Sequence, residues 1–470
     1  MSRTAAIARH RAYRSAAAAI WRKAGALALG AVMLVSLPVT GLAQGAILIR
    51  DAEIENLMRT YSFPLMRAAG LNPGSVDVHL IADKSINAFV AGGQRIFIHT
   101  GLLLDAATPN EVIGVLAHEV GHIAGGHLAR LQRQLDQMST TAIIGMLLGA
   151  AAMAGGMASG SPDAARAGSG VMIGGQSLAM RGLLSYQRAQ EAAADQAAVM
   201  YLDRTGQSAK GMLTLFEKLA NQAIVSLQYA DPYLQSHPMP RDRIQFLEQL
   251  ARKSPNFDKE DSPELVLRHQ LMHAKLRGYL QPLQSVLNHY PVSDTSKPAR
   301  YARAVAYYRS GDLRNALSEL EPLIAAMPDN PFFWELKGQA FFETGRVADA
   351  IAPLEKAVSL APKEPLIRIM LAQAMLGTEN ARYTDRAIEH LRVALQRETH
   401  SVTLHRQLAI AYARKGEIGL AELQSAEASL LTGDIDLAKR QAARAVAQLK
   451  RGTPQWVKAN DIVQLPVPDK

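Results

Sequence analysis

The chain has 470 residues, 48% of them apolar, which suffices for two or three domains with well-packed cores. It has no cysteine, which excludes disulfides, thiolate metal sites, a cysteine nucleophile and a lipid-modified N-terminal cysteine. The formal net charge is +9, but residues 1–43 carry six positive side chains and no acid, so +9 minus 6 leaves +3 for the rest. Without a basic patch interleaved with aromatic residues, this charge predicts no nucleic-acid partner.

The N-terminal stretch 1–43 reads as a signal peptide. Its basic residues lie between Arg3 and Lys23, an apolar run follows, and Gly41-Leu42-Ala43 has the small-x-small pattern of a cleavage site. We expect export to the periplasm and removal of this segment. The alternative is a permanent membrane anchor, which the short apolar run with its internal proline disfavours.

A helix is expected over residues 51–69, a strand over 75–82, and a hairpin over 87–101 that turns at Gly92-Gly93. An exposed strand can pair with the backbone of an extended peptide substrate, whatever the sequence of that peptide. We expect the second strand of the hairpin to have this role. It consists of Arg95, Ile96, Phe97, Ile98 and His99. A purely structural hairpin is the alternative, and His99 is expected to be a strand-face histidine rather than a metal ligand.

The next helix carries the motif His118-Glu119-x-x-His122. A capping pattern, Thr108-Pro109-x-Glu111, precedes it and predicts the start of the helix. Residues four apart share one helix face, so the two imidazoles are placed to bind one metal ion, and Glu119 beside them is placed to act as general base. Two surface histidines on an amphipathic helix are the alternative, but most neighbours are apolar, and burying such groups without partners is costly.

Nine residues after His118, and therefore about 2.5 turns later, His127 is expected on the opposite face as a structural or surface residue. Residues 139–182 are rich in glycine, alanine and methionine. They predict a mobile hydrophobic flap that covers the active site or touches a membrane surface. A membrane span and a buried helical hairpin are the alternatives.

A catalytic zinc site with three protein ligands needs one more donor. Glu191 is the candidate, and Asp195, one turn later, is placed to orient a ligand histidine. His237, restricted by the proline after it, either stabilises the oxyanion or occupies the open metal position and keeps the enzyme latent. Arg243 is expected to pair with Asp195 or with a substrate carboxylate. The alternatives are an exposed acidic pair and a turn histidine.

Beyond residue 253 the chain repeats. Gly311 and Gly345 are 34 residues apart, as are Ala316 and Ala350. A 34-residue helix–turn–helix period is typical of tetratricopeptide repeats, which stack into a superhelix whose groove binds peptides or proteins. Gly416 follows Gly345 by 71 residues, so about three residues are inserted, and residues 377–382 are the expected place.

Together these motifs resemble the gluzincin peptidases related to HtpX and the Ste-type CaaX proteases, and within them the periplasmic BepA type. The motifs that carry the resemblance are Asn87-Ala88-Phe89, Thr100-Gly101-Leu102-Leu103, His118-Glu119-Val120-Gly121-His122, Glu191-x-x-x-Asp195 and Ser236-His237-Pro238. The resemblance implies a zinc endopeptidase that degrades misassembled outer-membrane proteins and works beside the barrel-assembly machinery.

The predicted fold is an α+β, mainly helical zincin-like metalloprotease domain (44–252) followed by an all-α tetratricopeptide-repeat superhelix (253–470). One Zn²⁺ per chain is expected, held by His118, His122 and Glu191. Unfolded or misassembled outer-membrane proteins are the expected substrates. The repeats are expected to contact the barrel-assembly machinery, with peripheral membrane contact. A chaperone or assembly adaptor with latent proteolysis is the alternative function, and a nonpeptidase zinc hydrolase is a third.

Overall fold

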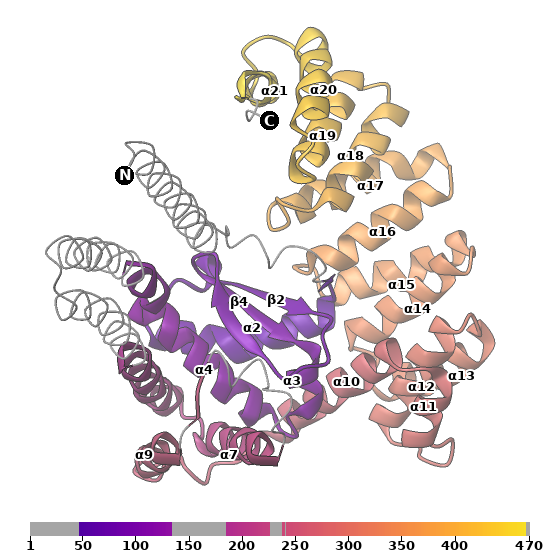
Figure 1. Cartoon of the computed structure of the whole chain (residues 1–470). Helices are drawn as coiled ribbons and strands as arrows, with labels where there is room; N and C mark the ends of the chain where they lie inside the picture. The colour runs from indigo at the N-terminus through magenta and orange to yellow at the C-terminus, as the bar shows by residue number, and fades with distance from the viewer. Residues whose placement is uncertain (1–46, 134–184, 226–236, 240, 467–470) are drawn as a thin grey trace, which may run out of the picture. The chain divides into compact units, whose positions relative to one another are not determined.

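The computed structural model describes residues 47–133, 185–225, 237–239 and 241–466 (Figure 1). The predicted signal peptide (1–43) and the predicted flap (139–182) lie outside these residues. Within the described part of the chain, no helix is both long and apolar enough to cross a membrane. The described residues from Ile49 onward belong to one compact unit.

The first half of this unit combines a small sheet with several helices. Its elements, in chain order, are β1 (Leu48–Ile49), α2 (Ala52–Ala68), β2 (Asp77–Ile81), β3 (Ala88–Ala91), β4 (Arg95–His99), α3 (Thr100–Asp105), α4 (Pro109–Gly125), helical residues 185–204, α7 (Lys210–Val225), α9 (Arg241–Ala251) and α10 (Pro263–Leu280), with a short 3₁₀ turn at Pro73–Ser75.

The sheet has the strand order β1-β2-β4-β3. Strand β4 runs parallel to β2 and antiparallel to β3, and the predicted hairpin joins β3 to β4. Gly92, Gly93 and Gln94 form its three-residue turn between Ala91 and Arg95. The two glycines have φ of 56° and 96°, in the left-handed backbone region that glycine adopts at little cost.

One hydrophobic core joins the sheet to helices α2, α4, α7 and α9. Helix α4 lies deep in this core: Val112, Val115, Leu116 and Val120 are fully buried, and side chains around most of its circumference are covered. A helix that is apolar on most sides is stable only inside a core. The motif on α4 therefore lies on a helix that is buried in the core on most of its sides.

The second half is all helical, as predicted. Figure 1 shows successive antiparallel helices, and adjacent ones pack against each other. Their bounds are α11 (Leu283–His289), α12 (Lys297–Arg309), α13 (Leu313–Ala326), α14 (Pro331–Glu343), α15 (Val347–Leu360), α16 (Pro365–Gly377), α17 (Thr384–Leu395), α18 (Val402–Arg414), α19 (Ile418–Leu431), α20 (Ile435–Gln448) and α21 (Pro454–Gln464), with a 3₁₀ turn at Ala381–Tyr383 before α17.

The 34-residue period has a structural counterpart. Gly311, Gly345 and Gly416 close equivalent turns with φ between 77° and 81°. Three residues separate α12 from α13 and α14 from α15, whereas six residues, 378–383, separate α16 from α17. The three inserted residues therefore lie where the sequence placed them.

Helix α10 belongs to both cores. Its residues Met272 and Leu276 pack into the core around α4, while Leu271 and Ala274 pack among the first repeat helices. The predicted domain boundary after residue 252 stays a prediction. Helix α10 follows this boundary and packs against both halves.

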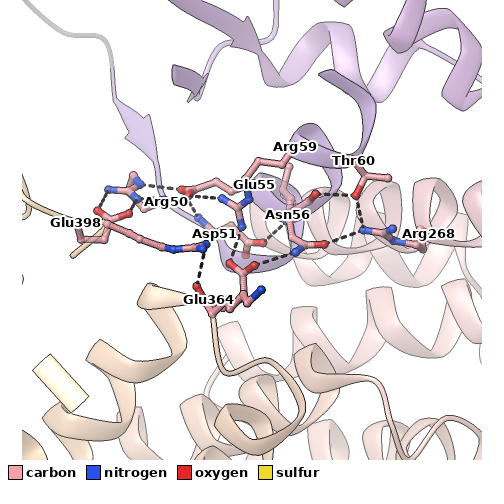
Figure 2. Close-up of polar contacts among 12 residues, drawn as sticks. Arg50, Asp51, Glu55, Asn56, Arg59, Thr60, Arg268, Glu364 and Glu398 are labelled. Atoms are coloured by element: carbon pink, nitrogen blue, oxygen red, sulfur yellow. Dashed lines mark hydrogen bonds and ion pairs between the residues drawn. The ribbon is translucent and has the colours of Figure 1, made fainter. Parts of the chain in front are cut away.

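Polar contacts of α2 strengthen this junction (Figure 2). The carboxylate of Glu364, at the N-terminus of α16, accepts hydrogen bonds from Asn56 and Arg59 of α2. Arg268 of α10 donates to Asn56 Oδ1 at 2.9 Å. Side chains of α2, α10 and α16 thus form one network between the sheet-containing half and the repeats.

Candidate metal centre

The start of helix α4 is fixed by its cap. The hydroxyl of Thr108 accepts a hydrogen bond from the backbone N–H of Glu111, and Glu111 Oε2 accepts one from the backbone N–H of Ala107 at 2.9 Å. Pro109 occupies the first helical position. The bond to Thr108 is the one that the capping pattern predicts. Glu111 accepts from Ala107, one residue before the cap, and not from the cap residue itself. These bonds determine which side chains of α4 face the interior.

Two histidines lie side by side on α4. The Nε2 atoms of His118 and His122 are 3.0 Å apart, which confirms the geometry predicted from their spacing. His118 and Glu119 have no exposed surface, and His122 is partly buried. Polar groups buried this deeply require partners from elsewhere in the fold.

Helical residues 185–204 bring Glu191 to these histidines. Glu191 Oε2 lies 3.4 Å from His118 Nε2, and Glu191 Oε1 lies 3.4 Å from His122 Nε2. One ligand atom from each of four residues lies within 4.8 Å of the others, and the four are His118, His122, Glu191 and His237. Imidazole and carboxylate donors converging in this way suit a divalent transition-metal ion.

Asp195 and Arg243 surround this cluster. Asp195 Oδ1 lies 3.0 Å from His118 Nδ1, the ring nitrogen that faces away from the other donors. Arg243 donates from Nε and Nη2 to the two oxygens of Asp195 at 2.7 and 2.9 Å, and its Nη1 lies 2.8 Å from Glu191 Oε2. The carboxylate of Asp195 orients the His118 ring, and the guanidinium holds both carboxylates in place. The predicted pairing of Arg243 with Asp195 is present.

Gly121 permits the two helices to approach. A Cβ atom at this position would lie 2.9 Å from the backbone oxygen of Ala194, closer than side-chain carbons approach a carbonyl. Gly121 lies two residues after Glu119 on α4, and Ala194 directly precedes Asp195 on the facing helix. The absence of a side chain at residue 121 therefore sets the distance between the histidines and Glu191.

Replacing Gly121 with alanine is expected to weaken metal binding. The added methyl group pushes against backbone that cannot rotate away, and such overpacking costs about 1–3 kcal/mol, partly offset by the roughly 1 kcal/mol that alanine gains over glycine in a helix. Chelator-competition titration measures the affinity for Zn²⁺. Gly74→Ala is the control, because its Cβ meets nothing closer than 3.5 Å. An unchanged affinity in Gly121→Ala contradicts this account.

His237 enters the cluster from the segment before α9. Its Nδ1 lies 3.0 Å from Glu191 Oε2 and 3.3 Å from His118 Nε2, and its Nε2 lies 3.6 Å from Glu119 Oε1. The ring thus touches both the donor set and the candidate base. Both roles predicted for His237, oxyanion stabilisation and occupation of the open metal position, are compatible with these distances.

Comparison with known proteins agrees with this geometry. Residues 49–251 match the model of peptidase family M48. Residues 301–365 match the tetratricopeptide-repeat model, which confirms the predicted repeats there.

Several curated proteins are similar to this chain. The putative beta-barrel assembly-enhancing protease of Vibrio cholerae is 29% identical over 265 residues, which cover 54% of this chain and 51% of that protein. The beta-barrel assembly-enhancing protease of Escherichia coli is 25% identical over 304 residues, covering 63% and 60%. Metalloprotease LoiP of Escherichia coli is 30% identical over 179 residues, covering 38% and 63%. The chain thus spans about half to three-fifths of the length of these relatives.

The side chains around the four-residue cluster fit a bound cation. Both carboxylate oxygens of Glu119 are buried and accept no hydrogen bond from the described residues, and burial raises the pKa of this carboxyl. A buried carboxylate in that position is costly unless positive charge lies beside it. A cation among His118, His122 and Glu191 supplies that charge.

The ionisation of the donors points the same way. Burial lowers the pKa of the His118 imidazole, but its contacts with Asp195 and Glu191 outweigh burial and raise the pKa to about 9. Burial, followed by the nearby His118 charge, lowers the pKa of His122 to about 2. The carboxylates therefore favour a positive charge at this point, and His122 offers a neutral ring nitrogen. Both conditions favour a metal ion, which competes with protons for the same donors.

The role expected for residues Arg95–His99 in pairing with a substrate backbone is wrong. Strand β4 lies between β2 and β3, so backbone groups on both of its edges are already paired. The side chains of Ile96 and Ile98 are fully buried in the core. His99 Nδ1 contacts Ser85 Oγ at 2.8 Å, so this histidine is a strand-face residue, as expected.

The open edge belongs to β3 instead. Among the described strands, β3 has β4 as its only neighbour. A cavity of about 180 Å³ joins this strand to the metal-ligand cluster. Its lining includes Phe89, Val90, Glu119, His122, Glu191 and His237. The periodicity that revealed the hairpin gave no signal for which of its two strands stays unpaired.

The expected position of His127 is also wrong. Helix α4 ends at Gly125, Gly126 adopts a left-handed backbone with φ of 63°, and a second helical run begins at His127. This break turns the His127 ring back, so that its Nδ1 lies 3.0 Å from His122 Nδ1. The opposite face is expected only if the helix continues unbroken to residue 127. The Gly125-Gly126 pair in the sequence indicates that the helix ends there.

Proposed function

We propose that this chain is a zinc-dependent endopeptidase of the cell envelope that hydrolyses peptide bonds in misfolded or misassembled outer-membrane proteins. The observation that carries the proposal is the convergence of four ligand atoms, from His118, His122, Glu191 and His237, within 4.8 Å at a cavity bordered by an open strand. In this proposal the first three residues hold the metal ion and the fourth lies beside it.

Zinc is the metal that this donor set favours. Two imidazoles and one carboxylate form the three-protein-ligand set of catalytic zinc sites, which leaves one position open. When bound, the ion acts as a Lewis acid that makes water more acidic and stabilises negative charge on oxygen. Asp195 and Arg243 keep the His118 ring and Glu191 oriented for this task.

Glu119 acts as the general base. Its carboxylate is buried next to the donor set and has no hydrogen-bond donor among the described residues, so it is available to accept a proton from the attacking water. Burial raises the pKa of this carboxyl, which makes it a better proton acceptor near neutral pH. Glu119 then passes the proton to the amine that leaves.

Strand β3 holds the substrate. An extended peptide that adds to its open edge gains backbone hydrogen bonds whatever its sequence, which suits cleavage of many unfolded chains. Phe89 and Val90 of β3 border the same cavity as Glu119, so a peptide on this edge passes the candidate base. His237, whose Nε2 lies 3.6 Å from Glu119 Oε1, is placed to donate a hydrogen bond to the oxyanion.

The position of His237 also favours a second candidate function. Its Nδ1 lies within the donor set, 3.3 Å from His118 Nε2, where it is placed to fill the open metal position. In that state the enzyme is latent until the segment 237–239 moves. The chain then acts chiefly as a chaperone or assembly adaptor for outer-membrane proteins through its repeats.

Periplasmic location, outer-membrane substrates and contact of the repeats with the barrel-assembly machinery belong to this proposal. The predicted signal peptide and the names of the similar proteins from Vibrio cholerae and Escherichia coli support it. The tetratricopeptide repeats supply a surface of the kind that binds proteins.

Removal and return of zinc tests the proposal. The protein as isolated is expected to contain one Zn²⁺ per chain and to cleave unfolded casein. Chelation is expected to abolish cleavage, and an equimolar amount of Zn²⁺ is expected to restore it. His118→Ala is expected to lack both zinc and cleavage.

A matched control is His400→Ala, which removes an exposed histidine of the repeats. Zinc present without cleavage supports the latent adaptor, and His237→Ala is then expected to release activity. Absence of zinc from folded wild-type protein contradicts the proposed metal centre.

A further inference from the structure

His127 contacts the metal-ligand cluster from outside it. Its Nδ1 lies 3.0 Å from Nδ1 of His122, and the two rings meet edge to face with centroids 4.9 Å apart. Only 7% of the His127 surface is exposed, so water does not compete freely for this contact. The Nε2 atom of His122 faces the opposite way, 3.0 Å from His118 Nε2 and 3.4 Å from Glu191 Oε1.

The direction of this hydrogen bond follows from the chemistry of the ring. A neutral imidazole has one N–H donor and one acceptor nitrogen. If His122 binds a metal through Nε2, its proton must lie on Nδ1. The Nδ1–H of His122 then donates to Nδ1 of His127, which must be the unprotonated nitrogen of that ring.

The way in which helix α4 ends brings the two rings into contact. Gly125 is the last residue of the helix, and a Cβ atom there would lie 2.2 Å from His127 Nε2. The imidazole of His127 therefore occupies the space that any side chain at residue 125 would fill. The left-handed Gly126 provides the turn that brings the ring into this space.

We propose that His127 is a positioning residue that accepts the Nδ1–H of His122 and so holds the Nε2 lone pair of His122 toward the metal. The inference rests on the proposed metal centre and assigns it a second orienting group. His118 is oriented by Asp195, and His122 is oriented by His127. Partners of this kind fix the tautomer and the ring orientation of ligand histidines.

Zinc titration of the full-length apoprotein against a competing chelator tests the inference. His127→Leu fills a similar volume without an acceptor, and we expect it to weaken zinc affinity about 10- to 100-fold. Gly125→Ala leaves His127 in the sequence but displaces its ring, so the same direction of change is expected. His127→Asn places an oxygen at the position of Nδ1 and is expected to recover most of the affinity.

Two further measurements separate positioning from general damage. Ala124→Ser, at an exposed neighbouring position, is expected to bind zinc like the wild type. In zinc-loaded protein, nitrogen-15 NMR of the histidines is expected to show a slowly exchanging Nδ1–H on His122, which His127→Leu exposes to exchange. Thermal unfolding of each apoprotein identifies variants that are misfolded.

The outcomes are distinct. If folded His127→Leu and Gly125→Ala bind zinc as tightly as the wild type, the inference is overturned and the metal centre stands. If wild-type protein binds no zinc, the proposed metal centre fails first and the inference falls with it. In a third outcome, His127→Leu binds zinc more weakly while Gly125→Ala binds it as tightly as the wild type. The position of the His127 ring then does not affect zinc binding, and the proposed positioning role is overturned.

Discussion

Glu119→Gln is expected to abolish peptide cleavage while leaving zinc bound. The substitution keeps the size and shape of the side chain but removes its ability to accept a proton. Loss of a general base lowers kcat by about 10²- to 10⁴-fold. Zinc content is expected to be unchanged, because the four clustered ligand atoms come from other residues. Casein cleavage and metal analysis on the same preparation measure both effects.

The burial of Glu119 adds a second expectation. Its carboxylate oxygens are buried without hydrogen-bond donors among the described residues, so a neutral amide at this place does not leave a charge in the interior. The melting temperature of the metal-free Glu119→Gln protein is therefore expected to equal or exceed that of the wild type. A marked fall in melting temperature would show that the Glu119 carboxylate stabilises the fold. That result contradicts the assignment of Glu119 as a general base that contributes no stability.

Glu217→Gln is the matched control, because it makes the same change at an exposed position of α7. It is expected to cleave casein at the wild-type rate. Complementation of a deletion strain distinguishes the two candidate functions. If Glu119→Gln restores the strain as well as wild type does, the adaptor role dominates in the cell.

Arg303→Ala is expected to destabilise the start of the repeat array by roughly 3–5 kcal/mol, because it removes one side of a buried ion pair. Among the described residues, Glu319 then keeps only its contact with the partly exposed Arg300, at 3.1 Å. Arg303, on α12, has no exposed surface. Its Nε and Nη2 donate to the carboxylate of Glu319 on α13 at 2.8 and 3.0 Å. Its Nη1 donates to the backbone oxygens of Pro291 and Asp294 at 2.8 and 2.9 Å. One side chain thus joins α12, α13 and the loop before α12.

Hydrogen exchange of the amides in α12 and α13 measures this change within the full chain. Since about 1.4 kcal/mol corresponds to a tenfold change in an equilibrium constant, protection is expected to fall by roughly 10²- to 10³-fold. Arg386→Ala is the control: Arg386 pairs with Glu355 in the same array, but both side chains are about half exposed, and such pairs contribute less than about 1 kcal/mol. If amide protection in α12 and α13 is equal in the two variants, the buried ion pair of Arg303 does not stabilise the array more than an exposed pair does, and the prediction is wrong.

The local geometry of the site could be predicted from the sequence. The four-residue spacing of His118 and His122 is enough to place their rings together, because the helix repeat alone determines it. The cap at Thr108 and the turn at Gly92-Gly93 depend on residues within a few positions of one another. The 34-residue period likewise predicted the turns at Gly311 and Gly345, since each repeat folds largely on neighbouring contacts.

Contacts between distant segments required the tertiary structure. The four-residue spacing of Glu191 and Asp195 predicts a third donor with an orienting partner, but only the packing of Gly121 against Ala194 brings Glu191 to the histidines. Sheet order decided that β3, and not β4, has the open edge, because strand pairing depends on which strands meet after folding. The break at Gly126 decided the position of His127, which an unbroken helix would have placed on the opposite face.

The sequence by itself therefore determined the chemistry carried by each short segment: the paired histidines with their glutamate, the hairpin and the repeats. The tertiary structure alone decided which of these segments meet, and hence that Glu191, His237, Asp195 and Arg243 surround His118 and that His127 supports His122. The physical reason is range. Hydrogen bonds within a helix or a turn are fixed by neighbours in the chain, whereas the approach of two helices is fixed by the side chains, or the missing side chain, between them.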